Sequence, residues 1–257
     1  MPKTQIIHPE DLRRAGRLEM PEIPLNRYNR TFEQELKSFS PEELKRIYLD
    51  MRYIREVETM IYGVRTVKNY NGIEYCYTGP AHLSTGQEAS AVGMAFTLDR
   101  DDIIFGSHRS HGEFLARGFR AVRTLGEDEL DNIMKSRPDL LSVVEKNSRS
   151  NNIRELAADF LLYGFICEVF GRANGFNRGH GNSMHVFFPP FGIYPNNAIV
   201  GGSAGIAAGA ALYRKVTRSG GLVVCNFGDG ALGRGPVWEA MNFAAMDQFN
   251  MLWEEDH

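Results

Sequence analysis

Residues 40–57 combine a helix start signal with apolar positions at helical spacing. Ser40 is placed to cap the helix, Pro41 suits its first position, and Glu43 is placed to return the capping hydrogen bond. The apolar side chains recur at steps of three or four residues: Leu44, Ile47, Tyr48, Met51, Ile54 and Val57. Because such steps align side chains on one face, the pattern predicts a helix packed against the core.

Two short apolar runs, residues 101–105 and 221–225, predict buried strands because each is bounded by turn residues. Small-residue helices are predicted at 89–98 and 204–213, and a further helix at 236–249. Strands and helices therefore alternate through glycine-rich turns. This order predicts an α/β fold with a doubly wound parallel sheet and helices on both faces.

The chain divides into a polar N-terminal arm and one large domain. Residues 1–39 are proline-dotted and weakly periodic, so we expect an arm that lies on another surface. Residues 40–257 are enough for a single α/β domain, with a charged helical insertion near 119–165. The glycine- and asparagine-rich segment 171–185 predicts a long loop, and such loops in compact domains are usually functional.

Composition and charge exclude several classes of protein. With 43% hydrophobic and 24% charged residues, the 257-residue chain has the composition of a soluble globular protein. Its formal charge of −3 gives no general attraction to nucleic acid or anionic membranes. No apolar run approaches the roughly 18 residues of a membrane span. The first residues lack the apolar core of a signal peptide, so we expect a cytoplasmic protein.

The three cysteines, Cys76, Cys167 and Cys225, lie among apolar or aromatic neighbours without paired spacing. We therefore expect small buried side chains in a reducing compartment, and neither a disulfide framework nor a zinc site. Zinc is further disfavoured because no two histidines share the spacing of helix-borne ligands. The absence of a G-x-S-x-G elbow disfavours a serine hydrolase.

The segment 221–230 carries the clearest chemical signal, because its apolar run ends on Gly228, Asp229 and Gly230. Glycines let the backbone turn sharply and approach a ligand closely. An aspartate at the tip of a strand is placed to bind a hard cation, and the amides that follow are placed to bind phosphate oxygens. A diphosphate bridged to Mg²⁺ would fit here. A plain strand-to-helix turn capped by Asp229 is the structural alternative.

A dinucleotide site is a second alternative, because residues 228–233 satisfy G-x-G-x-x-G and are followed by the acidic residues Glu254 and Glu255. Two features count against it. Only 24 residues follow the third glycine, whereas a dinucleotide fold must build several more strands. Pro236 also delays the helix and disturbs the usual tight turn. A P-loop is excluded because the chain has no G-K-[ST] sequence.

Basic side chains gather in the predicted loops at the ends of strands and helices. They are His82, His108, Arg109, His111, His180 and His185. A single histidine is more often structural than functional. The number of such groups in three loops favours an anionic ligand over a wholly structural explanation.

Together these segments resemble the alpha subunit of thiamine-diphosphate-dependent 2-oxo acid dehydrogenases, of the pyruvate, branched-chain and acetoin types. The resemblance runs in order through most of residues 41–249. The segments that carry it are Tyr48–Glu58, His82–Ala89, His108–Gly118, Gly179–His185, Asn197–Gly209 and Gly228–Ala245. Each segment alone is weak evidence, whereas the ordered set is highly specific. The resemblance implies the thiamine-diphosphate-binding version of the doubly wound fold.

The resemblance implies roles for the residues of the glycine turn. Asp229 matches the family's Mg²⁺ ligand. Gly230 and Ala231 match backbone contacts to the diphosphate, at the turn that begins with Gly228. Arg109 matches the phosphate-binding arginine. The cofactors implied are therefore thiamine diphosphate and Mg²⁺.

Further roles follow from the same resemblance. His108 stands where the family usually has a phosphate-binding tyrosine, and its charge would vary near neutral pH. Ala198 and Val200 match residues that line the cofactor through backbone or apolar contacts. His82 matches a histidine that faces the reactive ring and the substrate. The candidate catalytic residues are His82, His111 and His185.

The family's asparagine metal ligand falls just past His257 when residues are counted without a gap, so we expect a domain that is incomplete at its C-terminal end. The implied activity is decarboxylation of a 2-oxo acid, with transfer of the acyl group to a lipoyl-bearing acyltransferase. A beta-type subunit or fused beta-type domain is the implied partner. A dinucleotide-dependent oxidoreductase and a non-catalytic interaction subunit with this fold remain the alternatives.

Overall fold

The computed structural model describes residues 10, 13–16 and 28–246, and the chain falls into two units, Met1–Pro41 and Glu42–His257. In the first unit, helix α2 (Phe32–Glu35) begins with a reciprocal capping box. The Thr31 hydroxyl accepts from the amide of Gln34, whose side chain accepts from the amide of Thr31. Most of the expected arm, residues 1–39, lies outside the described residues, and its docking on another surface stays a prediction.

The second unit contains a three-stranded parallel sheet in the order β4 (Ile193–Tyr194), β3 (Ile103–Phe105) and β5 (Val223–Cys225). In the register, Ile104 of the central strand lies opposite Ile193 on one side and Val224 on the other. The expected α/β class is therefore confirmed, and a strand lies within each expected segment. β3 is buried as expected, whereas β5 is only half-buried. The full doubly wound arrangement stays a prediction.

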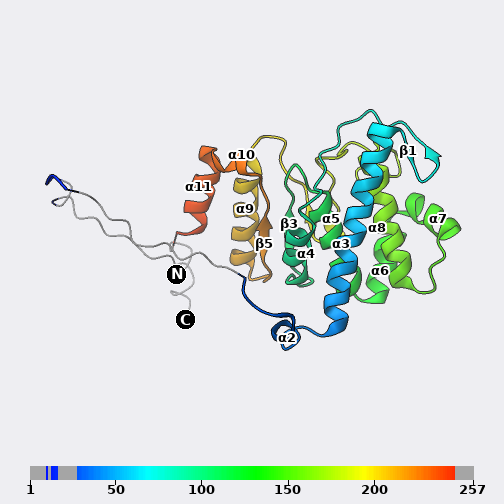
Figure 1. The fold of residues 1–257 in the computed structure, drawn as a ribbon, viewed down its shortest axis with the longest axis horizontal. Helices are drawn as coiled ribbons and strands as arrows, with labels where there is room; N and C mark the ends of the chain where they lie inside the picture. The colour runs from blue at the N-terminus through cyan, green and yellow to red at the C-terminus, as the bar shows by residue number, and fades with distance from the viewer. Residues whose placement is uncertain (1–9, 11–12, 17–27, 247–257) are drawn as a thin grey trace. The chain divides into compact units, whose positions relative to one another are not determined.

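Helices pack on both faces of this sheet, because successive side chains of β3 point in opposite directions. Ile103 and Phe105 pack with Ala207 of helix α9 (Gly202–Thr217), whereas Ile104 belongs to the larger core on the other face. Helices α4 (Glu88–Phe96) and α5 (His111–Thr124) contribute to that core. Figure 1 shows α9 and α11 (Gly235–Ala244) to one side of the strands and α4 to the other.

The larger core also includes helix α3 (Pro41–Tyr62) and three helices of the charged region, α6 (Glu127–Lys135), α7 (Pro138–Asn147) and α8 (Ile153–Val169). Their apolar faces meet in one cluster of buried side chains that includes Ile54, Leu130, Leu140, Phe160 and Phe165. The region near 119–165 is therefore helical, as expected, and it shares the core of the sheet-bearing unit. Residues 148–152 separate α7 from α8.

A small hairpin follows α3 and the single π-helical turn η1 (Gly63–Val67). Strands β1 (Asn69–Tyr70) and β2 (Ile73–Glu74) pair antiparallel across Asn71 and Gly72. These two residues have φ values of 50° and 82°, the left-handed backbone that a two-residue hairpin turn requires. The hairpin is short and lies apart from the parallel sheet (Figure 1).

Two expectations are corrected by the structure. Cys167 is buried, but Cys76 is exposed just after the hairpin, so the cysteines do not all act as small core residues. The helix expected at 236–249 is preceded by a short helix, α10 (Asp229–Leu232), which begins directly at the glycine turn. Pro236 therefore lies in the first turn of a second helix, α11, which ends at Ala244, instead of delaying the first helix. Residues 247–249 lie outside the described part of the chain.

The described helices give no sign of a membrane-spanning segment, since none combines the necessary length with the necessary apolarity.

Because α6 and the sheet share one core, we expect them to unfold together. Leu130 of α6 is fully buried, so Leu130→Ala should lower the free energy of unfolding by about 2–5 kcal/mol while keeping a single transition in urea. Leu49→Ala on α3 is the control, because that side chain is 39% exposed. Two separate transitions, with only one of them shifted, would show that α6–α8 form an independent body.

Candidate functional site

The carboxyl ends of the three parallel strands open into a cavity of about 630 Å³. Its walls are the loops that follow β3 at 106–108, β4 at 196–201 and β5 at 226–231. Parallel strands bring their carboxyl ends to the same edge of a sheet, so loops far apart in sequence meet there. This is the position at which open α/β sheets bind their ligands.

The cavity collects most of the residues that the sequence singled out. Those that line it are His108, His185, Ala198, Val200, Gly228, Asp229, Gly230 and Ala231. Arg109 lines an adjoining cavity of about 530 Å³, whose walls also include His108, Gly228 and Asp229. The two spaces therefore meet at the glycine turn and His108. His180 lines neither cavity and is exposed.

The glycine turn leaves its backbone open to the cavity. A Cβ at Gly228 would lie 3.2 Å from Cε1 of His108, so a larger residue would press on that ring. A Cβ at Gly230 would meet nothing within 4 Å, and both Gly230 and Asp229 are exposed. The amide of Ala231 already donates to the carbonyl of Gly228 at 2.9 Å. The turn thus presents the Asp229 carboxylate and the neighbouring backbone to a ligand.

No three histidine, cysteine, aspartate or glutamate side chains cluster as metal ligands among residues 10, 13–16 and 28–246. Asp229 therefore supplies one carboxylate and not a complete coordination shell. Asn226 is a further oxygen-bearing side chain that lines both cavities, and sequence reasoning missed it. Its signal was its place directly after β5, ahead of the glycine turn.

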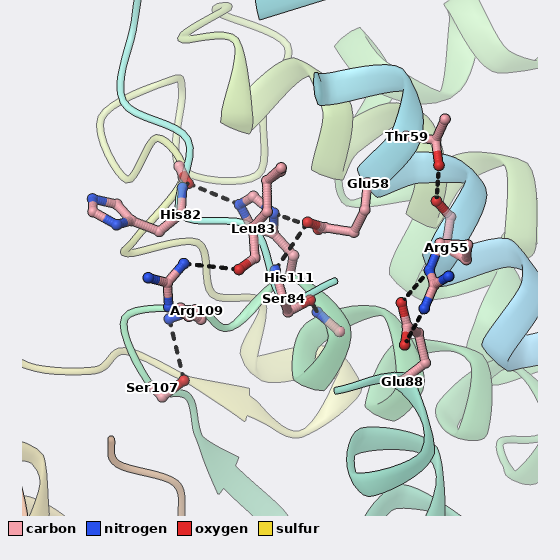
Figure 2. A network of polar contacts seen from close by, with 12 residues as sticks. Arg55, Glu58, Thr59, His82, Leu83, Ser84, Glu88, Ser107, Arg109 and His111 are labelled. Atoms are coloured by element: carbon pink, nitrogen blue, oxygen red, sulfur yellow. Dashed lines mark hydrogen bonds and ion pairs between the residues drawn. The ribbon is translucent and has the colours of Figure 1, made fainter. Parts of the chain in front are cut away.

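Arg109 and His82 face the same side of the site. Figure 2 shows the His82 imidazole and the Arg109 guanidinium projecting together, away from Glu58. The guanidinium is held by a hydrogen bond from Nη1 to the carbonyl of Leu83 at 2.9 Å. The ring centroids of His82 and His108 are 5.8 Å apart. Burial, followed by the nearby charges of His108 and Arg109, lowers the pKa of His82 and favours its neutral form.

His185 is fixed by an amide that joins two loops. Its Nδ1 lies 2.7 Å from Oδ1 of Asn196, while Nδ2 of Asn196 donates to the carbonyls of Ser107 and Met184 at 3.1 and 2.8 Å. Nδ2 of Asn196 is thus a hydrogen-bond donor, so Oδ1 of Asn196 accepts a hydrogen bond from Nδ1–H of His185. In the neutral ring, Nε2 of His185 is then left as an acceptor.

The loop that carries His185 folds around one buried carboxylate, Glu168 at the end of α8. One oxygen accepts from the amides of Asn177 and Gly179 at 2.7 and 2.9 Å. The other accepts from the amides of Gly181 and Asn182 at 2.6 and 3.3 Å. Glu168 is fully buried, and its four backbone donors satisfy the charge in place of water. Sequence reasoning missed this residue because it lies outside the loop motif.

His111 is placed differently from the other candidate catalytic residues. It is fully buried at the start of α5 and lines neither cavity. Its Nδ1 lies 2.6 Å from Oε1 of Glu58, and its Nε2 lies 2.8 Å from Oγ of Ser183. The candidate histidines therefore comprise His185, which lines the larger cavity, His82, which lines neither cavity but lies beside His108, and the buried His111.

A second acidic side chain, Glu113 of α5, lies beside the glycine turn in the cavity that Arg109 lines. Its carboxyl accepts from the amide and the hydroxyl of Ser107 at 2.7 and 2.9 Å. Burial nevertheless raises its pKa to about 7. This carboxyl is therefore close to half protonated at neutral pH, beneath the loop that carries His108 and Arg109.

Comparison with known proteins agrees with this arrangement. The protein family described as "Dehydrogenase E1 component" matches residues 74–135 and 147–252, which include all three loops of the cavity. The chain belongs to this family. The residues between the two matched segments, 136–146, cover most of α7. The helical insertion expected near residues 119–165 stays a prediction.

Several named E1-type relatives are similar to the chain. It is 32% identical over 168 residues to the alpha subunit of acetoin:2,6-dichlorophenolindophenol oxidoreductase from Bacillus subtilis, covering 65% of this chain and 38% of the relative. It is 30% identical over 210 residues to the pyruvate dehydrogenase E1 component subunit alpha of Zymomonas mobilis, covering 80% and 45%. The mitochondrial counterpart of Solanum tuberosum is 28% identical over 207 residues, covering 80% and 41%. The chain thus spans less than half the length of these relatives.

The anchoring role of Glu168 is testable by removing its charge. In Glu168→Gln, an amide NH₂ group would face backbone N–H donors, so the free energy of unfolding should fall by about 3 kcal/mol. Glu155→Gln is a control on the same helix, since Glu155 is exposed and accepts a backbone hydrogen bond from the amide of Asn151. Equal urea midpoints for the two variants would contradict the anchoring role.

The raised pKa of Glu113 predicts a pH-dependent stability. The folded chain binds this proton more tightly than the unfolded chain, whose carboxyl has the ordinary value of 4.5. The contribution of Glu113 to the free energy of unfolding should therefore fall by about 3 kcal/mol as pH rises from 4.5 to 7.

Glu113→Gln isolates that contribution, because the amide keeps the shape and cannot ionise. Urea unfolding at several pH values should show the variant gaining stability relative to the parent chain across this window. A stability difference that does not change with pH would contradict the raised pKa.

Proposed function

We propose that this chain is the alpha-type component of a 2-oxo acid dehydrogenase, which binds thiamine diphosphate and Mg²⁺ at the carboxyl edge of the parallel sheet. The observation that carries the proposal is the meeting of Arg109, His108 and Asp229 around the glycine turn, in adjoining cavities. These positions match the phosphate-binding and metal-binding positions of the E1 family. Relatives named as acetoin and pyruvate dehydrogenase alpha subunits support the same assignment.

The side chains present fit such a cofactor. The guanidinium of Arg109 and the ring of His108 are donors for phosphate oxygens, and the Asp229 carboxylate is a hard ligand suited to Mg²⁺. The open backbone at Gly230 lets a diphosphate approach closely. The other cavity wall carries the exposed side chain of Val200, an apolar surface suited to an organic ring. When bound, thiamine diphosphate supplies the nucleophile and the electron sink for the loss of CO₂ from a 2-oxo acid.

The chain's own part in the reaction is to position the reactants and to supply hydrogen bonds. His82 is held near its neutral form beside Arg109, so its ring can donate one hydrogen bond to a developing oxyanion without carrying a full charge. His185, fixed through Nδ1 by Asn196, keeps Nε2 as an acceptor directed by that bond. The two rings therefore have complementary roles as donor and acceptor.

The proposal extends to the fold and the partners of the complete enzyme. The three parallel strands, with helices on both faces, support a doubly wound sheet of the thiamine-diphosphate type. The names of the relatives, which are alpha subunits, support a beta-type subunit or fused beta-type domain as partner. A lipoyl-bearing acyltransferase is the corresponding acceptor of the acyl group.

Calorimetric titration tests the phosphate-binding position. The chain should bind thiamine diphosphate in the presence of Mg²⁺ and lose that binding in EDTA. Arg109→Gln should weaken binding roughly ten- to a hundred-fold, because it removes one charge-assisted contact. Arg100→Gln is the matched control, since Arg100 pairs with Glu129 at the surface and lines neither cavity.

Equal affinities for the two arginine variants would contradict the assignment. Binding of NAD in place of thiamine diphosphate would replace it with the dinucleotide alternative.

The metal-binding position has its own test. Asp229→Asn removes a carboxylate charge while keeping the shape of an exposed side chain, so folding should be unchanged. The variant should require a higher Mg²⁺ concentration for half-maximal thiamine diphosphate binding, by roughly tenfold or more. An unchanged Mg²⁺ requirement would remove Asp229 from the metal site.

A further inference from the structure

A buried chain of hydrogen bonds joins three parts of the fold behind the cavity. Glu58 of α3 lies 2.6 Å from Nδ1 of His111 on α5, and Nε2 of His111 lies 2.8 Å from Oγ of Ser183 in the 171–185 loop. All three side chains are fully buried, with 0% exposure. A buried polar network is costly unless its members satisfy one another, so its presence calls for an explanation.

The arrangement has the order of a serine–histidine–carboxylate triad, but it does not present a nucleophile. Oγ of Ser183 is fully buried and accepts a hydrogen bond from the backbone amide of His82 at 2.9 Å. Neither His111 nor Ser183 lines a cavity of the candidate site. A reacting group would need open space beside Oγ, and none is present. The network therefore acts on the protein and not on a substrate.

The donors and acceptors in this network satisfy one another. The carboxylate of Glu58 only accepts, so Nδ1 of His111 carries a proton toward it. The Ser183 hydroxyl already accepts from the amide of His82. A hydroxyl oxygen has two lone pairs and one proton, so Oγ can also share a hydrogen bond with Nε2 of His111. Both ring nitrogens of His111 are therefore satisfied within the network.

Both ends of the network hold the same short segment, residues 82–84. Ser183 accepts from the amide of His82, and Oε2 of Glu58 accepts from the amide of Ser84 at 2.9 Å. Between them, the carbonyl of Leu83 accepts from Arg109. Figure 2 shows this segment lying over His111, with the His82 ring turned away from Glu58 and toward the Arg109 side.

We propose that Glu58, His111 and Ser183 form a clamp that fixes the direction of the His82 ring, and that they are positioning residues. His111 is then assigned to the support of His82 instead of to contact with substrate. The use of the clamp in catalysis rests on the proposed function, because His82 is the residue placed to meet the 2-oxo acid. The clamp itself is a property of the folded chain without any cofactor.

The first test needs no cofactor and uses nitrogen-15 NMR of the full chain. Long-range spectra of the histidine side chains should show a proton on Nδ1 of His111, held by the Glu58 carboxylate. Exchange of the His82 amide proton should quicken roughly tenfold or more in Ser183→Ala, since that amide loses its acceptor.

Ser110→Ala is the matched control, because the buried Ser110 hydroxyl has no hydrogen-bond partner in the described part of the chain. It should leave exchange at His82 unchanged. A His111 ring without a proton on Nδ1, or equal His82 exchange in both serine variants, would overturn the clamp.

The second test measures catalysis in the assembled enzyme. Ser183→Ala should lower kcat for 2-oxo acid decarboxylation roughly tenfold or more, while thiamine diphosphate affinity changes less than about twofold. A parallel loss of cofactor affinity would contradict a role in directing His82. Failure of the parent chain to bind thiamine diphosphate would refute the proposed function alone, because the NMR result on the clamp does not depend on it.

Discussion

Parallel pairing of β3 with β4 and β5 brings the carboxyl ends of three strands to one edge of the sheet, and the candidate site exists because of that geometry. The three loops that line the larger cavity are separated by long stretches of chain, and only the common strand direction makes them neighbours. The pairing depends in turn on burial of both faces of β3. Ile104 packs into the larger core, while Ile103 and Phe105 pack under α9.

The loops at this edge have little regular structure, and buried carboxylates give them their shape. Glu168 gathers the backbone amides of the 171–185 loop, and Glu58 holds Ser84 while it accepts from His111. Glu88 acts in the same way, because it accepts from the amide of Gly86 and pairs with Arg55. That pairing is the leading cause of its pKa, which is lowered to about 2. Charge-assisted bonds to backbone amides are stronger than neutral ones, so each carboxylate helps to fix the backbone of a loop that lacks regular secondary structure.

The sequence alone was sufficient for the elements with strong local signals. The strands at β3 and β5, the start of α3 at Pro41 and the loop before His185 follow from apolar patterning and turn residues. The site residues at the glycine turn followed from the chemistry of a strand tip together with a family resemblance. Contacts between distant segments could not be predicted. Nothing local in the sequence shows that Glu58 reaches His111, or that α6–α8 share the core of the sheet.

The central claim, that the three sheet-edge loops form one site for thiamine diphosphate, is tested most directly by hydrogen exchange measured by mass spectrometry. The chain would be compared with and without thiamine diphosphate and Mg²⁺, and with NAD as the competing ligand. We expect slower exchange in peptides covering residues 106–109, 196–201 and 226–231, with no change across α6 and α7. Protection of those loops by NAD alone, or protection confined to other parts of the chain, would contradict it.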